Sequence, residues 1–420
     1  MEKWKLYTPE GVQDILPLET CIKRELEKRA RKVFSSYGFM EIETPTIEFY
    51  DTFSVEKELL PQEIMFKIFD EKGRILVLRP DMTIPVARMA ATKFESFKFP
   101  AKISYIANTF RFGETGGGKQ KEFTQAGIEL LGAKSPEADA QVIATAIKTL
   151  LEMGLKEFQI DIGQSEFFKG IMENTGLDSN QIEQVRSLID TKDFLGLEKI
   201  IKELKMKGEA KEIILGMPGY FGSVDVIKRA KKAAVNKRAI NALINLEEII
   251  SIIDDYGYSK YVSIDLGLVN SLNYYSGVIF KGFTYGIGFP ILSGGRYDNL
   301  IEKFGKNIPA TGFSMGINMV MMALTRQKID IGVKISPDIF VCYEKESRKQ
   351  AVKSVQKLRE EGYKVELDIE NMDINKAAQY INKKEIKKLL LIKKDGKINV
   401  VKANRDTMIY DNIEDIAKGE

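Results

Sequence analysis

Apolar residues recur at helical spacing in two stretches of the first 154 residues. Between residues 18 and 38, one helical face carries Ile22, Leu26, Ala30, Val33, Phe34 and Tyr37. This spacing predicts a helix that ends at Gly38. A second helix is expected after Ser135, a favourable N-cap, with Pro136 in its first turn and Gly154 at its end.

Short apolar runs between and after these helices predict strands. The expected strands are residues 39–42, 75–78, 103–111, 123–131, 261–265, 277–283 and 287–292. The segment 113–121 is expected to be the loop that joins two of them. A helix is predicted over 312–324, after a glycine-rich stretch that is typical of backbone packed closely against a ligand or other strands.

Two further regions differ from this pattern. Residues from about 165 to 255 are rich in Lys, Glu, Ile and Leu at helical spacing, which predicts a helical insertion. From Pro337 onwards, strands alternate with helices, and Asp395-Gly396 is typical of a hairpin turn. We therefore expect one domain over 1–325, which contains the insertion, and a small α/β domain over 336–420.

Composition narrows the functional classes. The 420 residues include 63 Lys and Arg against 60 Asp and Glu, so the net charge of +3 gives no whole-chain nucleic-acid footprint. Cys21 and Cys342 are too few and too far apart for a disulfide framework. No apolar run reaches the roughly 18 residues of a membrane span. The first residues, MEKWKLYTPEG, lack the apolar core of a signal peptide. We expect a cytoplasmic protein.

The chain contains no histidine. This excludes Ser-His-Asp and Cys-His nucleophiles, an imidazole base and an HExxH zinc site. With two separated cysteines a structural zinc site is excluded as well, and we expect no bound metal or cofactor. Nucleotide chemistry driven by arginine and carboxylate-held Mg²⁺ is the catalytic option that survives.

One glycine-rich segment imitates a phosphate-binding loop. Residues 113–120, GETGGGKQ, match GxxxxGK[ST] except at the last position, where Gln120 replaces the hydroxyl that should hold Mg²⁺. A phosphate loop also runs into a helix N-terminus, whereas this segment runs into a predicted strand. A hairpin loop is the better interpretation.

Seven short motifs occur together and in order. They are GFMEIETP (38–45), LRPDMT (78–83), Phe110-Arg111, FTQAGIE (123–129), NSLNYY (270–275), GGRYD (294–298) and GFSMG (312–316). In this order they resemble class II histidyl-tRNA synthetases, and also the synthetase paralogues that serve as regulatory subunits of ATP phosphoribosyltransferase. The resemblance spans nearly the whole chain.

The resemblance implies an α+β fold, with a class II aminoacyl-tRNA synthetase-like antiparallel sheet flanked by helices. It also implies dimerisation through the segment around Pro45 and a C-terminal domain like an anticodon-binding domain. Several positions depart from the synthetase pattern. The motif-two glutamate is Gly113, the catalytic arginine is Asn270 and the ATP-holding arginine is Met319, with Asn318 in place of its acidic neighbour.

Loss of two arginines argues against catalysis. Amino-acid activation needs fixed cations on the ATP phosphates and on the charge that develops at the adenylate. The later arginines of the motif-two loop fall on Lys119 and Lys121, which keep the charge but lose the planar fork. We expect that synthetase activity is lost.

The positions that would bind the amino acid match the synthetase pattern better than those that would bind ATP. The resemblance places histidine contacts on Asp81, Thr83, Arg111, Gln125, Glu129, Tyr275 and Tyr297. Carboxylates can hold an ammonium or an imidazole N–H, arginine a carboxylate, and tyrosines a flat apolar surface with a polar tip. Asp81 stands where the synthetases usually have Glu, so this contact is expected to be longer or water-mediated.

Each of these residues has a structural alternative. Gln125 and Glu129 share a strand face and could line a buried polar network. Tyr275 and Tyr297 could be plain core aromatics. Asp81 could cap the helix that follows it, and Gly294-Gly295 could be only a tight turn. The functional interpretation rests on their joint appearance.

A pocket without phosphate-handling cations predicts a sensor. The resemblance then implies a non-catalytic regulatory subunit of ATP phosphoribosyltransferase. It would assemble with a short-form catalytic subunit, support the first step of histidine biosynthesis and mediate feedback by free histidine. We expect no membrane and no tRNA partner.

Two alternatives stay open at this point. An authentic divergent histidyl-tRNA synthetase would use the C-terminal domain, with Lys383, Lys384, Lys387, Lys388, Lys393 and Lys394 meeting tRNA phosphates. These lysines could equally form a solvated face. The other alternative is a non-enzymatic, RNA-binding or kinase-regulating relative of the synthetases.

Overall fold

The architecture is described from a computed structural model, which describes residues 3–55, 60–112, 120–173, 175–234, 236–269, 274–402, 407–410 and 413. The chain divides into two compact units, Met1–Val333 and Lys334–Glu420. Each unit is described by itself.

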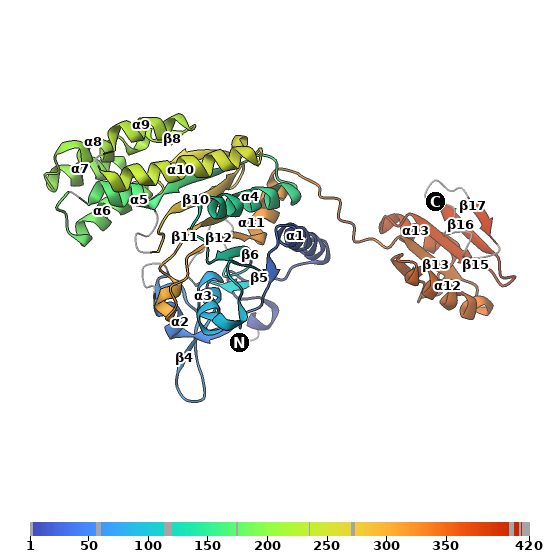
Figure 1. The fold of residues 1–420 in the computed structure, drawn as a ribbon. Helices are drawn as coiled ribbons and strands as arrows, with labels where there is room; N and C mark the ends of the chain where they lie inside the picture. The colour runs from blue at the N-terminus through green and yellow to red at the C-terminus, as the bar shows by residue number, and fades with distance from the viewer. Residues whose placement is uncertain are drawn as a thin grey trace. The chain divides into compact units, whose positions relative to one another are not determined.

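A large mixed sheet forms the centre of the first unit (Figure 1). Its strands follow one another across the sheet in the order β1-β5-β6-β12-β11-β10-β7-β9-β8. Their bounds are β1 Met40–Glu41, β5 Ala101–Phe110, β6 Glu122–Leu131, β7 Phe158–Gln164, β8 Phe221–Gly222, β9 Val262–Asp265, β10 Val278–Thr284, β11 Leu292–Arg296 and β12 Ala310–Gly316. Adjacent strands pair antiparallel except at β1–β5 and β7–β9, which are parallel.

Alternation along β6 sends its side chains to two different faces. Ala126, Ile128 and Leu130 lie in one hydrophobic core, together with the apolar side of the long helices. Gln125 and Glu129 therefore point to the opposite face, because successive strand residues alternate. The second core covers that opposite face. This period-two pattern places the polar pair between the sheet and its second helical layer.

Helices cover both faces of the sheet (Figure 1). The first core joins the sheet to α1 Pro17–Ser36, α4 Pro136–Glu152, α10 Lys237–Asp255 and α11 Ile317–Arg326. The second core joins it to α2 Tyr50–Ser54, α3 Thr83–Thr92 and the 3₁₀ turn η6 Ile301–Phe304. Next to α2 and α3 lies a small antiparallel sheet in the order β2-β4-β3, made of β2 Ile47–Phe49, β3 Lys67–Phe69 and β4 Ile75–Leu78.

The helical insertion lies at the β8 end of the sheet (Figure 1). Its helices are α5 Ser165–Met172, α6 Ser179–Asp190, α7 Phe194–Glu203, α8 Gly208–Leu215, α9 Asp225–Ala233 and the long α10. Local capping explains several of their starts: Asp178 and Gln181 form a capping box, and Asn236 accepts a hydrogen bond from the Ala239 amide. The inward faces of these helices extend the first core.

Two predicted elements are corrected by the structure. The strand expected over 287–292 is instead β11, which begins at Leu292, and Gly294 and Gly295 are strand residues, not a tight turn. The helix expected over 312–324 begins only at Ile317, because Gly312–Gly316 belongs to β12. The glycines pair where no side chain fits: a Cβ on Gly294 would lie 2.4 Å from the Gly312 carbonyl oxygen. Both segments form strands although glycine has a weak strand propensity, because the neighbouring strands pack closely against them.

The second unit is a small α/β domain. Its sheet has the order β14-β13-β15-β16-β17, and helices accompany it within the described residues. The bounds are β13 Ile339–Tyr343, α12 Arg348–Glu360, β14 Val365–Leu367, α13 Ile374–Lys383, β15 Lys388–Ile392, β16 Ile398–Lys402 and β17 Thr407–Tyr410. β17 was not predicted. With the insertion and the flanked sheet of the first unit, this confirms the predicted α+β fold class.

Candidate functional site

A cavity of about 190 Å³ lies on the α3 face of the large sheet, beside β6, β11 and β12. Its lining comes from the turn before α3, the end of β5, the segment before β10 and the glycines of β11 and β12. The lining residues are Leu60, Asp81, Thr83, Arg111, Glu129, Tyr274, Tyr275, Ser293, Gly294, Gly295, Tyr297, Gly312, Phe313 and Ser314. Six of the seven residues predicted to contact histidine are thus brought together.

Glu129 is the buried carboxyl group of this cavity, only 1% exposed. Its Oε1 accepts hydrogen bonds from Thr83 Oγ1 at 2.9 Å and from the Tyr105 hydroxyl at 3.1 Å. Its Oε2 accepts one from the Tyr297 hydroxyl. Three hydroxyl donors fix the carboxyl group, and each can also accept a hydrogen bond if Glu129 is protonated.

Glycine at position 312 leaves room for this carboxyl group. Gly312 is the direct partner of Glu129 across the β6–β12 pair. A Cβ on Gly312 would lie 1.7 Å from Glu129 Oε2, closer than two non-bonded atoms can approach. The glycine of the GFSMG motif is therefore required by the close approach of a side chain from the neighbouring strand.

Burial sets the protonation of the cavity. Desolvation is the largest cause that raises the pKa of Glu129, to about 8, and the charge of Asp81 adds to it, while the three hydroxyl donors lower it. Burial likewise raises the pKa of the Tyr105 and Tyr297 hydroxyls, so both stay protonated as donors near neutral pH. Glu129 is therefore mostly neutral at pH 7.

Asp81 has two tasks in this structure. Its Oδ1 accepts a hydrogen bond from the Ile84 amide at 3.1 Å, so it does cap the first turn of α3. The same carboxylate lines the cavity and is 9% exposed. The capping interaction holds the carboxylate in place next to Thr83, the first residue of α3. The structural alternative and the predicted position in the pocket are therefore both present.

Arg111 supplies positive charge to the cavity. Its Nε donates to the Pro80 carbonyl at 2.9 Å, which ties it to the turn that carries Asp81. The guanidinium lies over the Phe123 ring at 5.5 Å from the centroid. Arg111 is the one arginine among the described lining residues, and Asp81 and Glu129 bring carboxyl groups to the same cavity. Such an arrangement is complementary to a zwitterion.

Three tyrosines form an aromatic wall. Tyr274 meets Tyr275 edge-on at 4.7 Å between ring centroids and stacks on Tyr297 at 5.5 Å with an interplanar angle of 6°. All three belong to the second core and also line the cavity. Tyr275 and Tyr297 are therefore core aromatics and pocket walls at once. Tyr274 was missed as a lining residue, although its place beside Tyr275 in NSLNYY was a usable signal.

Gln125 is not among the lining residues of the cavity. It is buried, and its Oε1 accepts a hydrogen bond from the Met82 amide at 3.1 Å. This bond links β6 to the turn before α3. Gln125 thus matches the buried polar network that was the structural alternative, and its contact to the site runs through the backbone next to Asp81 and Thr83.

Comparison with known proteins assigns the family. A model of the family described as histidyl-tRNA synthetase matches residues 11–320. An ATP phosphoribosyltransferase regulatory subunit from Acetivibrio thermocellus is 58% identical over 400 residues, covering 95% of this chain and 96% of that protein. The chain belongs to the ATP phosphoribosyltransferase regulatory subunit family. A second member, from Ruminiclostridium cellulolyticum, is 54% identical and covers 95% of each chain.

Solved structures agree with membership of the regulatory subunit family. A crystal structure described as an ATP phosphoribosyltransferase regulatory subunit/histidyl-tRNA synthetase from Bacillus halodurans C has a TM-score of 0.81 at 30% identity. It covers 89% of this chain, and this chain covers 96% of it. Histidyl-tRNA synthetase from Nostoc sp. PCC 7120 has a TM-score of 0.84 at 25% identity over 99% of both chains. The class II synthetase-like fold predicted from the motifs is thereby confirmed.

One departure of this regulatory subunit family member from the synthetase pattern can be located. Met319 lies on the first turn of α11, half-buried against the first core. Its neighbour Asn318 accepts a hydrogen bond from the Thr124 amide at 2.9 Å and donates one to Gln120 at 2.7 Å. Both side chains are neutral and used within the fold. Gly113 and Asn270, like the loop 113–119 that imitates a phosphate loop, lie outside the described residues.

Three further observations concern metal binding, membrane spans and the C-terminal lysines. Among the described residues, no group of three or more His, Cys, Asp or Glu side chains could hold a metal ion. Within the same residues, every helix is too short or too polar to cross a bilayer. Of the C-terminal lysines, Lys384 is 3.4 Å from Glu366 and lies over the Tyr380 ring. Its charge is therefore partly engaged within the domain.

Proposed function

We propose that this chain is the regulatory subunit of a hetero-oligomeric ATP phosphoribosyltransferase, without catalytic activity of its own. It assembles with a short-form catalytic subunit, supports the first step of histidine biosynthesis and transmits feedback by free histidine, which binds in the cavity. The names of the relatives support the role as regulatory subunit. The partner's form and the effector are the finer part of the proposal.

One observation carries the choice of ligand. The lining of one cavity contains the guanidinium-bearing Arg111, the carboxyl groups of Asp81 and Glu129, and tyrosine rings. An amino acid has the matching ends, a carboxylate and an ammonium. The cavity is also smaller than the ~300–1,000 Å³ that suits drug-sized ligands, which favours a single amino acid. The aromatic wall and the buried Glu129 suit an imidazole ring with an N–H donor.

Loss of synthetase activity is part of the same proposal. Activation of histidine requires cations that neutralise the charge developing on ATP. Met319 replaces one with a thioether that packs on the core, and Asn270 replaces another by sequence. Each missing donor of this kind typically lowers a rate by about 10²–10³-fold. The site keeps the side chains that recognise an amino acid and lacks those that activate it.

Self-association through the segment around Pro45 completes the proposal. Met40, Ile47, Phe49 and Phe69 are large apolar side chains near this segment, and all are exposed, Phe69 by 73%. A cluster of exposed apolar side chains is typical of an interaction surface. We place the subunit in the cytoplasm, and we propose that tRNA is not a partner.

Reconstitution tests the proposal. The short-form catalytic subunit is assayed for ATP- and phosphoribosyl pyrophosphate-dependent product formation, alone and with this chain. We expect that adding the chain raises activity and that histidine inhibits only the mixture. Full activity and full histidine inhibition of the catalytic subunit alone, unchanged by this chain, would contradict the proposal.

A further inference from the structure

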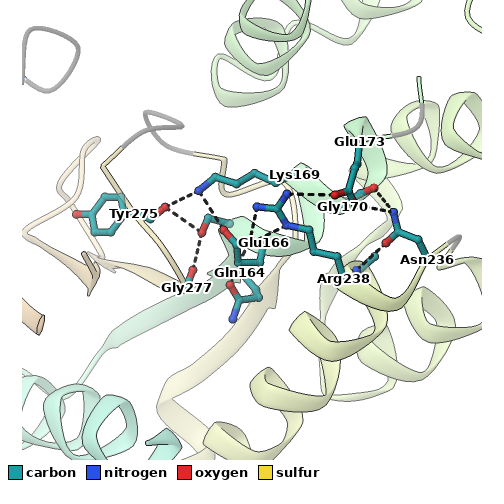
Figure 2. Close-up of polar contacts among 11 residues, drawn as sticks. Gln164, Glu166, Lys169, Gly170, Glu173, Asn236, Arg238, Tyr275 and Gly277 are labelled. Carbon is teal, nitrogen blue, oxygen red and sulfur yellow. Dashed lines mark hydrogen bonds and ion pairs between the residues drawn. The ribbon is translucent and has the colours of Figure 1, made fainter. Parts of the chain in front are cut away.

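A polar network connects the helical insertion to the wall of the cavity at Tyr275 (Figure 2). Lys169 on α5 donates a hydrogen bond from Nζ to the Tyr275 carbonyl oxygen at 2.9 Å. The same ammonium lies 3.0 Å from Glu166, one turn earlier on α5. Lys169 thus holds the backbone of a cavity residue from outside the cavity, on an element to which the sequence assigned no role.

The backbone around Tyr275 is clamped at a second point. Ser165 Oγ donates to the Gly277 carbonyl at 2.9 Å and also lies 3.3 Å from the Tyr275 carbonyl. The Ser165 amide donates to the Gly277 carbonyl as well, at 2.9 Å. The start of α5 therefore fastens residues 275–277 directly, and Lys169 adds a charged contact to this segment.

The position of the Tyr275 backbone determines where its ring lies. A Cβ on Gly295 would be 2.6 Å from Tyr275 Cε1, so the ring rests closely on the backbone of β11. Tyr275 also meets Tyr274 edge-on, and Tyr274 stacks on Tyr297, whose hydroxyl donates to Glu129. Figure 2 shows the ring turned away from the carbonyl that Lys169 holds. A shift of this carbonyl would move the aromatic wall.

On the other side, the network continues to the long helix α10. Arg238, in the first turn of α10, lies 2.7 Å from Glu166. Asn236, the N-cap of α10, donates to the Gly170 carbonyl at 2.6 Å. A Cβ on Gly170 would lie 2.7 Å from the Ala239 amide nitrogen, so α5 and the start of α10 are in close contact. Displacement of α10 would therefore change the ion pair between Arg238 and Glu166.

We propose that Lys169 is a positioning residue that holds the Tyr275 wall of the cavity, and that Glu166 and Arg238 make this hold sensitive to movement of α10. Glu166 is shared between two cations. If α10 moves and Arg238 withdraws, Glu166 draws the Lys169 ammonium more strongly and weakens its bond to the Tyr275 carbonyl. The affinity of the cavity for histidine then depends on the position of the helical insertion as well as on the lining residues. This inference rests on the proposed function in one respect, namely that the cavity binds histidine.

Three variants of the full-length chain test the proposal. Lys169→Met keeps most of the aliphatic stem and removes the ammonium, and Arg238→Gln releases Glu166. The matched control is Lys228→Met, which breaks an exposed ion pair of the same spacing on α9, where Lys228 lies 3.3 Å from Asp225. Histidine affinity is measured by calorimetry, and hydrogen exchange is followed at the Ser276 amide, which donates to the Arg296 carbonyl at 2.8 Å.

We expect Lys169→Met to weaken histidine binding roughly three- to tenfold and to speed exchange at Ser276, while Lys228→Met changes neither. Arg238→Gln should weaken binding about twofold, and it should have no added effect in a Lys169→Met background, because Arg238 acts through Lys169. A merely structural Arg238 would instead weaken both backgrounds equally, which would overturn the role assigned to it.

The outcomes separate this inference from the proposed function. If the wild-type chain binds no histidine, the ligand assignment fails, but exchange at Ser276 still tests the hold on Tyr275. If the wild-type chain binds histidine and Lys169→Met changes neither affinity nor exchange, Lys169 is not a positioning residue.

Discussion

Replacing Glu129 by glutamine should remove a proton-linked step from ligand binding. Glu129 is buried beneath three hydroxyl donors, and its pKa is raised to about 8. At pH 7 about nine-tenths of the empty protein therefore carries a proton on this group. A ligand N–H placed against the carboxyl group favours its ionised form, so binding should release about 0.9 proton at pH 7. The Glu129→Gln variant has no proton to release.

The expected loss of affinity follows from two opposing terms. A hydrogen bond to a charged partner contributes about 1.5–3 kcal/mol. Removing the proton at pH 7 costs about 1.4 kcal/mol, because the pKa lies about one unit above the pH. The difference is about 1 kcal/mol, so Glu129→Gln should weaken histidine binding roughly fivefold at pH 7. At pH 8.5 the cost nearly vanishes, and the loss should grow to about 30-fold.

Calorimetry in two buffers with different ionisation enthalpies measures the released proton directly. The control is Glu157→Gln, which neutralises an exposed glutamate of the same unit. Wild type and control should release the same proton, and Glu129→Gln should release none. Proton release that persists in Glu129→Gln, or an affinity loss that shrinks as the pH rises, would refute this reasoning.

The same group predicts how stability changes with pH. The folded pKa of Glu129 lies above its unfolded value of about 4.3. Its contribution to folding is therefore complete below about pH 4.3 and is lost as the pH rises towards 8. Between pH 5.5 and 8 the empty wild-type protein should lose on the order of 3 kcal/mol from this source. Denaturant titrations should show a flatter pH profile for Glu129→Gln, and parallel profiles would contradict the raised pKa.

Three further predictions concern packing and assembly. Gly312→Ala must displace the buried carboxyl group of Glu129, so it should lower the unfolding free energy by about 1–3 kcal/mol and remove most of the affinity for histidine. In the control Gly288→Ala, a Cβ meets no atom within 4 Å, and neither quantity should change. The buried Asp139 lies 2.9 Å from the Arg296 guanidinium, and Arg296→Met leaves its charge without this partner. The unfolding free energy should fall by about 3–5 kcal/mol, and a change below about 1 kcal/mol in denaturant titration would contradict this prediction. Phe49→Asp should weaken self-association in sedimentation experiments, and an unchanged dimer would remove this surface from the proposed interface.

The shared strand face of Gln125 and Glu129 could be predicted from sequence periodicity, whereas their assignment to a ligand site came from the resemblance. Alternation along 123–131 put Gln125 and Glu129 on one face, and the structure places that face against the second core. What alternation could not show is how each polar group is satisfied. Gln125 accepts a hydrogen bond from the Met82 amide and does not line the cavity, whereas Glu129 lines the cavity. The different roles of Gln125 and Glu129 depend on the turn before α3, which lies more than 40 residues earlier in the chain.

For the glycine-rich segments, the sequence predicted close backbone packing but not which residues form strands. β11 and the first half of β12 carry Gly294, Gly295 and Gly312, which have weak strand propensity and suggested a turn and a helix start. They are strands because neighbouring atoms, including the Glu129 carboxyl group and the Tyr275 ring, occupy the space of their missing side chains. This requirement arises only once the sheet is assembled. The role of Lys169 was hidden for the same reason, since it contacts a carbonyl 106 residues away.

The most direct test of the account is histidine inhibition of the reconstituted ATP phosphoribosyltransferase, with wild-type chain and with Glu129→Gln in its place. We predict that both chains activate the catalytic subunit and that the histidine concentration for half-inhibition rises roughly fivefold at pH 7 with the variant. Equal inhibition of both mixtures would show that feedback does not pass through this cavity.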